Sequence, residues 1–329
     1  MWFSALFAAV IAPAAATTYV LPADGGRIVG SIHYVTASKN DTLLDIARRF
    51  DVGYRQIRLA NPNVDVWLPG AGTRVKIPSQ FILPDTPHAG VVVNVPEMRV
   101  YYYPKPKHGA PQTVETFPIS IGRQDWNTPL GTTRIVVKIR HPAWYPPASI
   151  RAEHAAEGDP LPKVVPAGPD NPLGQFALRL GIPGYLMHGT NKPYGIGMRV
   201  SHGCIRLYPE DIKRLFSQVP KGARVHLVDQ PYRAAWQNGR LYLASSPLPS
   251  VEGASRLGPS SSEPMLPEEL PKLMQAVSRA ARGSGYAPDW NGVEAMAMTY
   301  DGLPHPVPMV GQPQAPPGDG AAATAKLDQ

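Results

Sequence analysis

Short apolar segments in the middle of the chain predict a mainly β domain. β-branched and aromatic residues gather in five short segments there, at 91–95, 98–103, 117–121, 132–139 and 224–228. The first two segments are close enough to form a hairpin. Because few helical patterns interrupt the segments, we expect residues 91–228 to form a β-sandwich or a partly closed barrel. One helix is expected inside this region, where Pro209, Glu210 and Asp211 precede apolar residues on one helical face.

Residues 33–78 predict a separate compact module, in which two strands enclose two helices. Its first and last segments alternate as strands do, and the two are expected to pair. Apolar residues recur at helical spacing after Asp41, a candidate N-cap, and again over 54–60. Asn61 and Pro62 end the second helix.

Weaker patterns occupy the remaining segments. The stretch 79–90 contains two prolines and predicts a linker. Residues 229–303 predict a C-terminal extension with short helices, whose apolar stripes lie within 266–282 and 290–298. The Pro/Gly/Ala-rich segment 304–329 predicts a disordered tail.

The first 16 residues predict an export signal. An apolar run from Trp2 to Pro13 is followed by three alanines, which suits cleavage after Ala16. The run departs from the usual pattern, because no Lys or Arg precedes it. The alternative is a buried N-terminal strand or helix.

Composition narrows the possible classes of protein. The chain has 329 residues, is 43% hydrophobic and carries a formal charge of +7. That apolar content is enough for a real core, and no apolar run after the N-terminus is long enough to span a membrane. The positive charge suits an anionic partner such as a cell-wall polymer, a membrane surface or nucleic acid. Nucleic-acid binding is the weakest of these, because Lys and Arg form no concentrated stripe.

Candidate chemistry centres on Cys204, the only cysteine. A thiol becomes a nucleophile as thiolate, and a nearby imidazole is the usual proton acceptor. If residues 202–204 are extended, His202 lies on the same face as Cys204. His188 needs an adjacent strand to bring it there, and Gly203 exposes backbone N–H groups that could hold an oxyanion.

Two other interpretations of these residues remain open. A lone cysteine is often a small buried hydrophobe with no chemical role. A zinc site formed by His188, His202 and Cys204 is the rival chemistry, but no paired metal-ligand spacing supports it. Nucleophilic chemistry by a thiol and an imidazole requires no metal and no organic cofactor.

The 33–78 module resembles a LysM module. It has the opening Tyr-x-Val, the Asp-Thr-Leu helix start, the Ala-Asn-Pro stop and the final Val-x-Ile-Pro. The resemblance implies a βααβ fold that binds N-acetylglucosamine-containing glycan in a shallow groove, with Asp41, Thr42, Asn61 and Pro62 as candidate groove positions. The alternative is a small domain that only spaces the rest.

The segments 188–191, 194–197 and 201–207 resemble the signature of the YkuD-type L,D-transpeptidases, in their ErfK/YbiS-like branch. The resemblance runs from about residue 90 to 228 and includes Thr128-Pro129 upstream. It implies a YkuD-like β-sandwich for this region.

The same resemblance implies a role for each signature residue. Cys204 would be the nucleophile, and His188 rather than His202 would accept and donate the proton. Gly189 would orient His188 through its carbonyl. His202 and Gly203 would shape the oxyanion region together with the backbone N–H of Cys204.

Three further positions are candidate substrate-binding residues. Arg206 could anchor a substrate carboxylate through its planar fork, or it could form a structural salt bridge. Ser201 and Thr190 lie beside the catalytic positions in the sequence and are expected to contact substrate.

The implied reaction is acyl transfer on peptidoglycan in the periplasm. Cys204 would attack the carbonyl of meso-diaminopimelate at stem position 3, releasing D-alanine and leaving a thioester. The acceptor would be another stem's amine, giving a 3→3 crosslink, or a lysine of an outer-membrane lipoprotein. Water as acceptor would make the protein an L,D-carboxypeptidase.

The alternative class is a non-catalytic peptidoglycan-binding protein. A monomer is expected, because no sustained heptad pattern is present.

Overall fold

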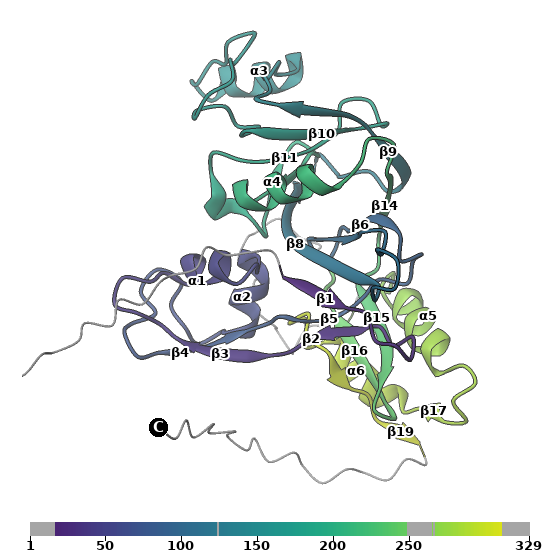
Figure 1. Cartoon of the computed structure of the whole chain (residues 1–329). Helices are drawn as coiled ribbons and strands as arrows, with labels where there is room; N and C mark the ends of the chain where they lie inside the picture. Colours follow the sequence, from purple (N-terminus) through teal and green to yellow (C-terminus); the bar gives the residue numbers. More distant parts are fainter. Residues whose placement is uncertain (1–16, 124, 249–264, 266, 311–329) are drawn as a thin grey trace, which may run out of the picture.

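The computed structural model describes residues 17–123, 125–248, 265 and 267–310 (Figure 1). The helices in these ranges are α1 (Leu43–Arg49), α2 (Tyr54–Ala60), α3 (Ala148–Ala156), α4 (Pro209–Gln218), α5 (Leu270–Ala281) and α6 (Trp290–Ala297), with a 3₁₀ turn η1 (Pro193–Gly195). The strands are β1 (Thr18–Val20), β2 (Ile28–Gly30), β3 (His33–Thr36), β4 (Arg74–Ile77), β5 (Gln80–Ile82), β6 (Gly90–Asn94), β7 (Arg99–Tyr103), β8 (Thr113–Gly122), β9 (Gly131–Arg140), β10 (Phe176–Leu180), β11 (Leu186–His188), β12 (Arg199–Ser201), β13 (Ile205–Leu207), β14 (Arg224–Val228), β15 (Tyr232–Gln237), β16 (Arg240–Ser245), β17 (Ala287–Pro288), β18 (His305–Pro306) and β19 (Met309–Val310). The predicted export signal lies outside the described residues. No helix in these ranges is long and apolar enough to cross a membrane.

The central sheet closes on itself. Its strands follow the order β8-β13-β11-β10-β9-β14-β6-β7, and β7 pairs again with β8. Closure depends on the length of β8. One part of it pairs with β7, through partners such as Phe117 and Val100, and the next part pairs with β13, through Ile119 and Leu207. The expected β-sandwich is therefore a closed, barrel-like sheet with an apolar interior.

Several predicted elements of this region are present. β6 and β7 form the predicted hairpin, and α4 begins at Pro209 as expected. β14 lies between β6 and β9, parallel to the first and antiparallel to the second. Strands β10 and β15 and helix α3 were not anticipated from the sequence pattern.

The 33–78 module has the predicted order of two strands and two helices. β3 pairs antiparallel with β4, and α1 and α2 pack over a core that includes Leu43, Ile57 and Val75. The predicted N-cap was wrong by one residue. Thr42 Oγ accepts from the backbone N–H of Asp45, 3.0 Å away, and the Asp45 carboxylate accepts from the N–H of Thr42.

Two segments expected to lack structure are ordered. The predicted linker 79–90 contains β5, which pairs with β2, because Phe81 and Ile82 are apolar enough to be fully packed between neighbouring cores. The predicted tail contains β18 and β19, and Val307 and Met309 are buried in the C-terminal core. Residues 311–329 of that tail lie outside the described ranges.

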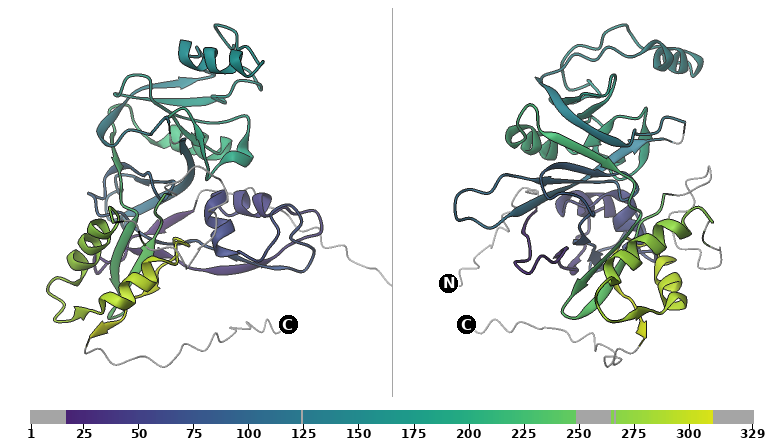
Figure 2. Two further views of the ribbon diagram at one scale, coloured as in Figure 1. Left: turned by 180° about the vertical axis from the view of Figure 1, so that it is seen from behind. Right: turned by 90° about the vertical axis from the view of Figure 1, so that its right-hand side faces the viewer.

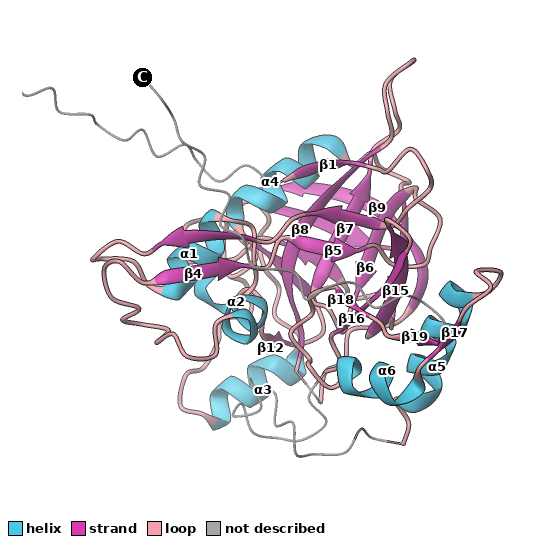
Figure 3. Ribbon diagram, turned by 90° about the horizontal axis from the view of Figure 1, so that it is seen from below, coloured by secondary structure: helices cyan, strands magenta, loops and turns pink. Residues whose placement is uncertain are grey.

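The C-terminal segment forms a unit with its own core. β15, β16 and β18 make a three-stranded sheet, and α5 and α6 pack against it (Figure 2). Seen from below, α1 and α2 lie on one side of the barrel and α5 and α6 on the other (Figure 3).

A buried carboxyl pair joins the 33–78 module to the barrel. Asp51 of the module and Asp211 of α4 hydrogen-bond to each other and are 4% and 1% exposed. Burial raises the pKa of Asp51 from 3.8 to about 6, against the opposing charge of Arg99. Burial and the charge of Asp51 raise the pKa of Asp211 well above its ordinary value. A carboxyl group whose pKa is higher in the folded than in the unfolded state contributes most to folding stability at a pH below its unfolded-state pKa. That contribution is lost as the pH rises through the folded-state pKa.

Asp51→Asn is therefore expected to raise the thermal unfolding midpoint by a few degrees at pH 8, but not at pH 4. The amide stays neutral, and asparagine accepts the positive φ of 52° at this position. The expected gain is on the order of 1–2 kcal/mol at pH 8. Circular dichroism melts of both proteins at both pH values measure it. The same difference between variant and wild type at pH 4 and pH 8 would contradict the carboxyl-pair explanation.

Candidate active site

Two parallel strands bring His188 and Cys204 to one side of the sheet. β11 pairs with β13 so that Met187 lies opposite Ile205 and His188 opposite Arg206. Met187 and Ile205 point into the barrel core. Since side chains alternate along a strand, His188 and Arg206 face the other way. Cys204 directly precedes β13, and its sulfur lies 3.7 Å from the Gly184 carbonyl oxygen, just before β11. The expectation that an adjacent strand carries His188 is confirmed.

The His188 ring is held in one tautomer. Its Nδ1 lies 2.7 Å from the carbonyl oxygen of Gly189. A carbonyl only accepts, so Nδ1 carries the proton and Nε2 keeps its lone pair. Burial lowers the pKa of His188 to about 3, and the charge of Arg206 adds to this, while the Gly189 carbonyl opposes it. The imidazole is therefore a neutral proton acceptor at neutral pH.

Gly189 lies close against α4. A Cβ on Gly189 would be 3.1 Å from Cγ2 of Ile212 and 3.4 Å from the Leu173 carbonyl oxygen. The lack of a side chain lets this backbone pack against the helix while its carbonyl meets the His188 ring. The position of α4 thus affects the orientation of the imidazole.

The Cys204 thiol is protonated at rest. Burial raises its pKa, although the backbone of Leu186 and the charge of Arg206 favour the thiolate. With His188 neutral as well, a proton transfer between these two groups would accompany attack by the thiol rather than precede it.

His202 does not lie as expected. Gly203 has a φ of +97°, and the chain bends at residues 202–203, so the assumed extended geometry is absent. His202 Nε2 lies 3.0 Å from Oε2 of Glu153 on α3, and the ring meets the edge of Trp126. Glu153 also pairs with Arg123 at 2.6 Å. His202 thus connects the α3 segment to the loop before Cys204.

Ser201 and Gly203 shape the turn that precedes Cys204. The Ser201 hydroxyl donates to the Cys204 carbonyl at 2.6 Å and accepts from the Gly203 N–H at 3.2 Å. The Gly203 N–H is therefore already used, which leaves the N–H of Cys204 as the oxyanion donor to consider. Thr128 adds a bond to the Gly203 carbonyl at 3.0 Å. Sequence reasoning assigned it no role, although the upstream Thr128-Pro129 pair was part of the resemblance.

The charge of Arg206, which lowers the pKa values of both Cys204 and His188, has no ion-pair partner among the described residues. Its Nε is buried without a hydrogen-bond partner, and no ion pair holds the guanidinium within the described part of the chain. Burial lowers its pKa from the ordinary value. The structural salt bridge considered from the sequence is therefore not formed among these residues.

The remaining predicted site residues are used within the fold. Thr190 is buried and its hydroxyl accepts from the Lys192 N–H at 2.9 Å. Asn61 is buried, and its amide bonds the Ile57 and Lys76 backbone. Asp41 accepts from Ser38 and Arg49, and Thr42 caps α1. Pro62 borders a cavity between α2 and α6, and Thr190 borders another beside the start of α4.

No metal-binding arrangement is found in the described ranges. No three His, Cys, Asp or Glu side chains are placed to hold an ion there. The alternative zinc set is not assembled, because His202 is turned to Glu153 and His188 Nδ1 is bonded to Gly189.

Comparison with known proteins agrees with this geometry. The family model described as the L,D-transpeptidase catalytic domain, YkuD, matches residues 88–227. The probable L,D-transpeptidase YbiS of Escherichia coli K12 is 44% identical over 283 residues, covering 84% of this chain and 89% of that protein. YcfS of the same organism is 46% identical, covering 74% and 78%, and ErfK/SrfK is 47% identical, covering 66% and 70%. The similarity to solved structures is weaker. The L,D-transpeptidase from Mycobacterium smegmatis superposes with a TM-score of 0.33 and is 20% identical in sequence. The match covers 48% of this chain and 64% of that one.

Proposed function

The chain belongs to the family of L,D-transpeptidases with a YkuD catalytic domain, and we propose that it acts on peptidoglycan stem peptides through Cys204 and His188. The observation that carries the proposal is the His188 ring, whose Nδ1–H is fixed on the Gly189 carbonyl while β11 lies parallel to the strand that follows Cys204. This leaves Nε2 as the base for the thiol.

The reaction proceeds in two acyl transfers. His188 Nε2 takes the thiol proton as Cys204 attacks the carbonyl of meso-diaminopimelate at stem position 3. The Cys204 N–H stabilises the oxyanion. Collapse breaks the amide bond to D-alanine, which leaves with the proton from His188, and a thioester remains. An acceptor amine then attacks the thioester, His188 removes its proton, and the thiol is regenerated.

Arg206 is the proposed anchor for a substrate carboxylate. Its guanidinium faces the same side as His188, and its Nε lacks a partner. Stem peptides carry carboxylates, and a planar guanidinium binds that group with two parallel bonds. Carboxylate binding would give the buried charge the partner that it lacks.

Three acceptors are compatible with the same thioester: a second stem's diaminopimelate amine, a lysine of an outer-membrane lipoprotein, and water. Incubating the protein with a disaccharide-tetrapeptide and analysing the products by mass spectrometry separates them. We expect crosslinked dimers with loss of one D-alanine. Tripeptide alone would mean an L,D-carboxypeptidase, and a new adduct only after adding the lipoprotein would identify that acceptor. Binding without any turnover or adduct would favour the non-catalytic, wall-binding alternative.

The 33–78 module is proposed to be a LysM module that binds glycan. Its two antiparallel strands and two helices support the proposal. The groove assigned from the sequence needs revision, because Asn61 and Thr42 are used internally. The loop before β4 instead exposes Trp67 and Leu68, which are 63% and 80% accessible, and exposed apolar side chains of this size mark interaction surfaces. A periplasmic location, export by residues 1–16 and a monomeric state complete the proposal.

A further inference from the structure

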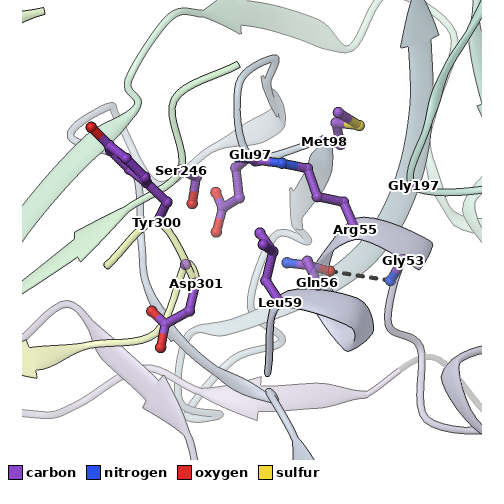
Figure 4. A pocket seen from close by; sticks show the side chains of 11 residues that line it. Gly53, Arg55, Gln56, Leu59, Glu97, Met98, Gly197, Ser246, Tyr300 and Asp301 are labelled. Atoms are coloured by element: carbon purple, nitrogen blue, oxygen red, sulfur yellow. Dashed lines mark hydrogen bonds between the residues drawn. The ribbon is translucent and has the colours of Figure 1, made fainter. Parts of the chain in front are cut away.

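The module touches the segment that connects His188 to Cys204. The backbone N–H of Tyr54, at the start of α2, donates to the Ile196 carbonyl at 2.9 Å. The next N–H, of Arg55, donates to the Gly197 carbonyl at 3.4 Å. The first N–H groups of a helix have no partner within the helix, so these carbonyls satisfy them. Figure 4 shows Gly53, Arg55 and Gln56 of the module beside Gly197.

Two glycines make this approach possible. A Cβ on Gly53 would be 2.9 Å from the Gly197 Cα, and a Cβ on Gly197 would be 2.2 Å from the Tyr54 nitrogen. Gly197 also has a φ of +90°, which side chains of L-residues rarely allow. The backbones of the module and of the catalytic segment are therefore in direct contact, with no side chain between them.

The module also holds α4, the helix behind Gly189. Arg48 on α1 forms a bidentate pair with Glu210 in the first turn of α4, at 2.7 and 2.8 Å. The Tyr208 hydroxyl, just before α4, donates to the Val52 carbonyl at 3.3 Å. Ile212 of the same helix packs on Gly189, whose carbonyl orients His188.

A buried arginine of the barrel fixes the loop that makes these contacts. Arg99 on β7 is fully buried and donates from Nη2 to the Asp51 carbonyl at 2.7 Å and to the Gln56 side chain at 3.0 Å. Arg55 donates to the Pro247 carbonyl at 2.7 Å. Residues 51–56, which comprise the loop before α2 and the first turn of that helix, are thus attached to the barrel and to the segment after β16. A domain on a flexible tether would lack such contacts.

We propose that residues 33–78 position the catalytic centre, in addition to any glycan that they bind. The module contacts residues 196–197, in the segment between His188 and Cys204, and it contacts α4, against which Gly189 packs. The inference rests on the proposed function, since it concerns the same Cys204 and His188. Small displacements matter here, because an error of about 1 Å in a catalytic group can reduce the rate about 100-fold.

Gly53→Ser tests the contact directly. Serine is a better N-cap than glycine, so α2 itself is not weakened, while the new Cβ meets Gly197. We expect kcat on soluble tetrapeptide to fall about tenfold or more, with KM changed less than about twofold. Lys39→Ser is the control, because it places the same side chain at an exposed position of the same module. This control is expected to keep wild-type kcat. Wild-type kcat in folded Gly53→Ser would overturn the proposal.

A charge exchange gives a second, independent test. Arg48→Glu and Glu210→Arg each place like charges in contact, and each is expected to lower kcat several-fold. The double variant restores the pair and is expected to recover most of the loss in kcat. Thermal melts of all three variants show whether the single variants stay folded at the assay temperature, so that the loss in kcat is not a loss of folded protein. If Gly53→Ser fails to fold, this exchange decides: unchanged kcat in both single variants refutes the positioning role. Inactive wild-type protein would refute the proposed function instead.

Discussion

Cys204→Ala is expected to abolish acyl transfer while the fold survives. The thiol is the proposed nucleophile of the acyl-enzyme, so turnover should fall on the order of 10⁴-fold or more. Alanine removes only the sulfur from a half-buried position, so the thermal midpoint should change little. Intact-mass measurement after incubation with a disaccharide-tetrapeptide, and separately with a carbapenem, should show an adduct on wild type alone.

The alternatives give different results in the same experiment. Equal adducts on wild type and Cys204→Ala would place the nucleophile elsewhere. No adduct on folded, reduced wild type would leave the chain a peptidoglycan-binding protein and make the 33–78 module its functional centre. A wild-type adduct with no crosslinked product would point to hydrolysis of the thioester.

His188→Gln is expected to lower kcat by about 10²–10⁴-fold, which is the usual contribution of a positioned general base. The wild-type rate should not fall between pH 8 and pH 5 because of this histidine. Its pKa lies near 3, so it stays neutral across that range. In the variant, the thiol must ionise unaided, and because its pKa is raised, alkylation by iodoacetamide should become fast only in strongly alkaline solution. A pH–rate profile and alkylation rates measure both effects.

His202→Gln is the informative comparison for this prediction. His202 bonds Glu153 on α3, so its loss should loosen the α3 segment and lower kcat less than loss of His188. A larger loss for His202→Gln than for His188→Gln would reverse the assignment of the base. A wild-type acid limb with an apparent pKa near 6 that persists in Asp51→Asn would instead show that His188 titrates in its ordinary range.

Strong local patterns in the sequence predicted much of the fold. The β6–β7 hairpin and helices α4, α5 and α6 form where periodicity and end signals agree, because those contacts are between near neighbours in the chain. The candidate pair was also accessible from the sequence. A single cysteine two residues after one histidine, with a second histidine before a glycine, leaves few arrangements for thiol chemistry.

Other features depend on partners that are distant in the sequence. The barrel closes because β8 pairs with both β7 and β13. His202 turns to Glu153 because Gly203 adopts a positive φ, which any glycine permits but does not reveal. β18 forms because β16 offers it a free edge, although its own composition resembles a disordered tail.

The sequence by itself therefore determined which residues are candidates for the chemistry and which short segments become strands or helices, since both depend on local composition. Only the tertiary structure decided how these parts act together. The contact of Gly53 with Gly197 joins residues far apart in the chain, and two glycines among many carry no mark of it. Close backbone packing is set by the relative positions of whole elements. The contact between the 33–78 module and residues 196–197 can therefore be recognised only in the tertiary structure.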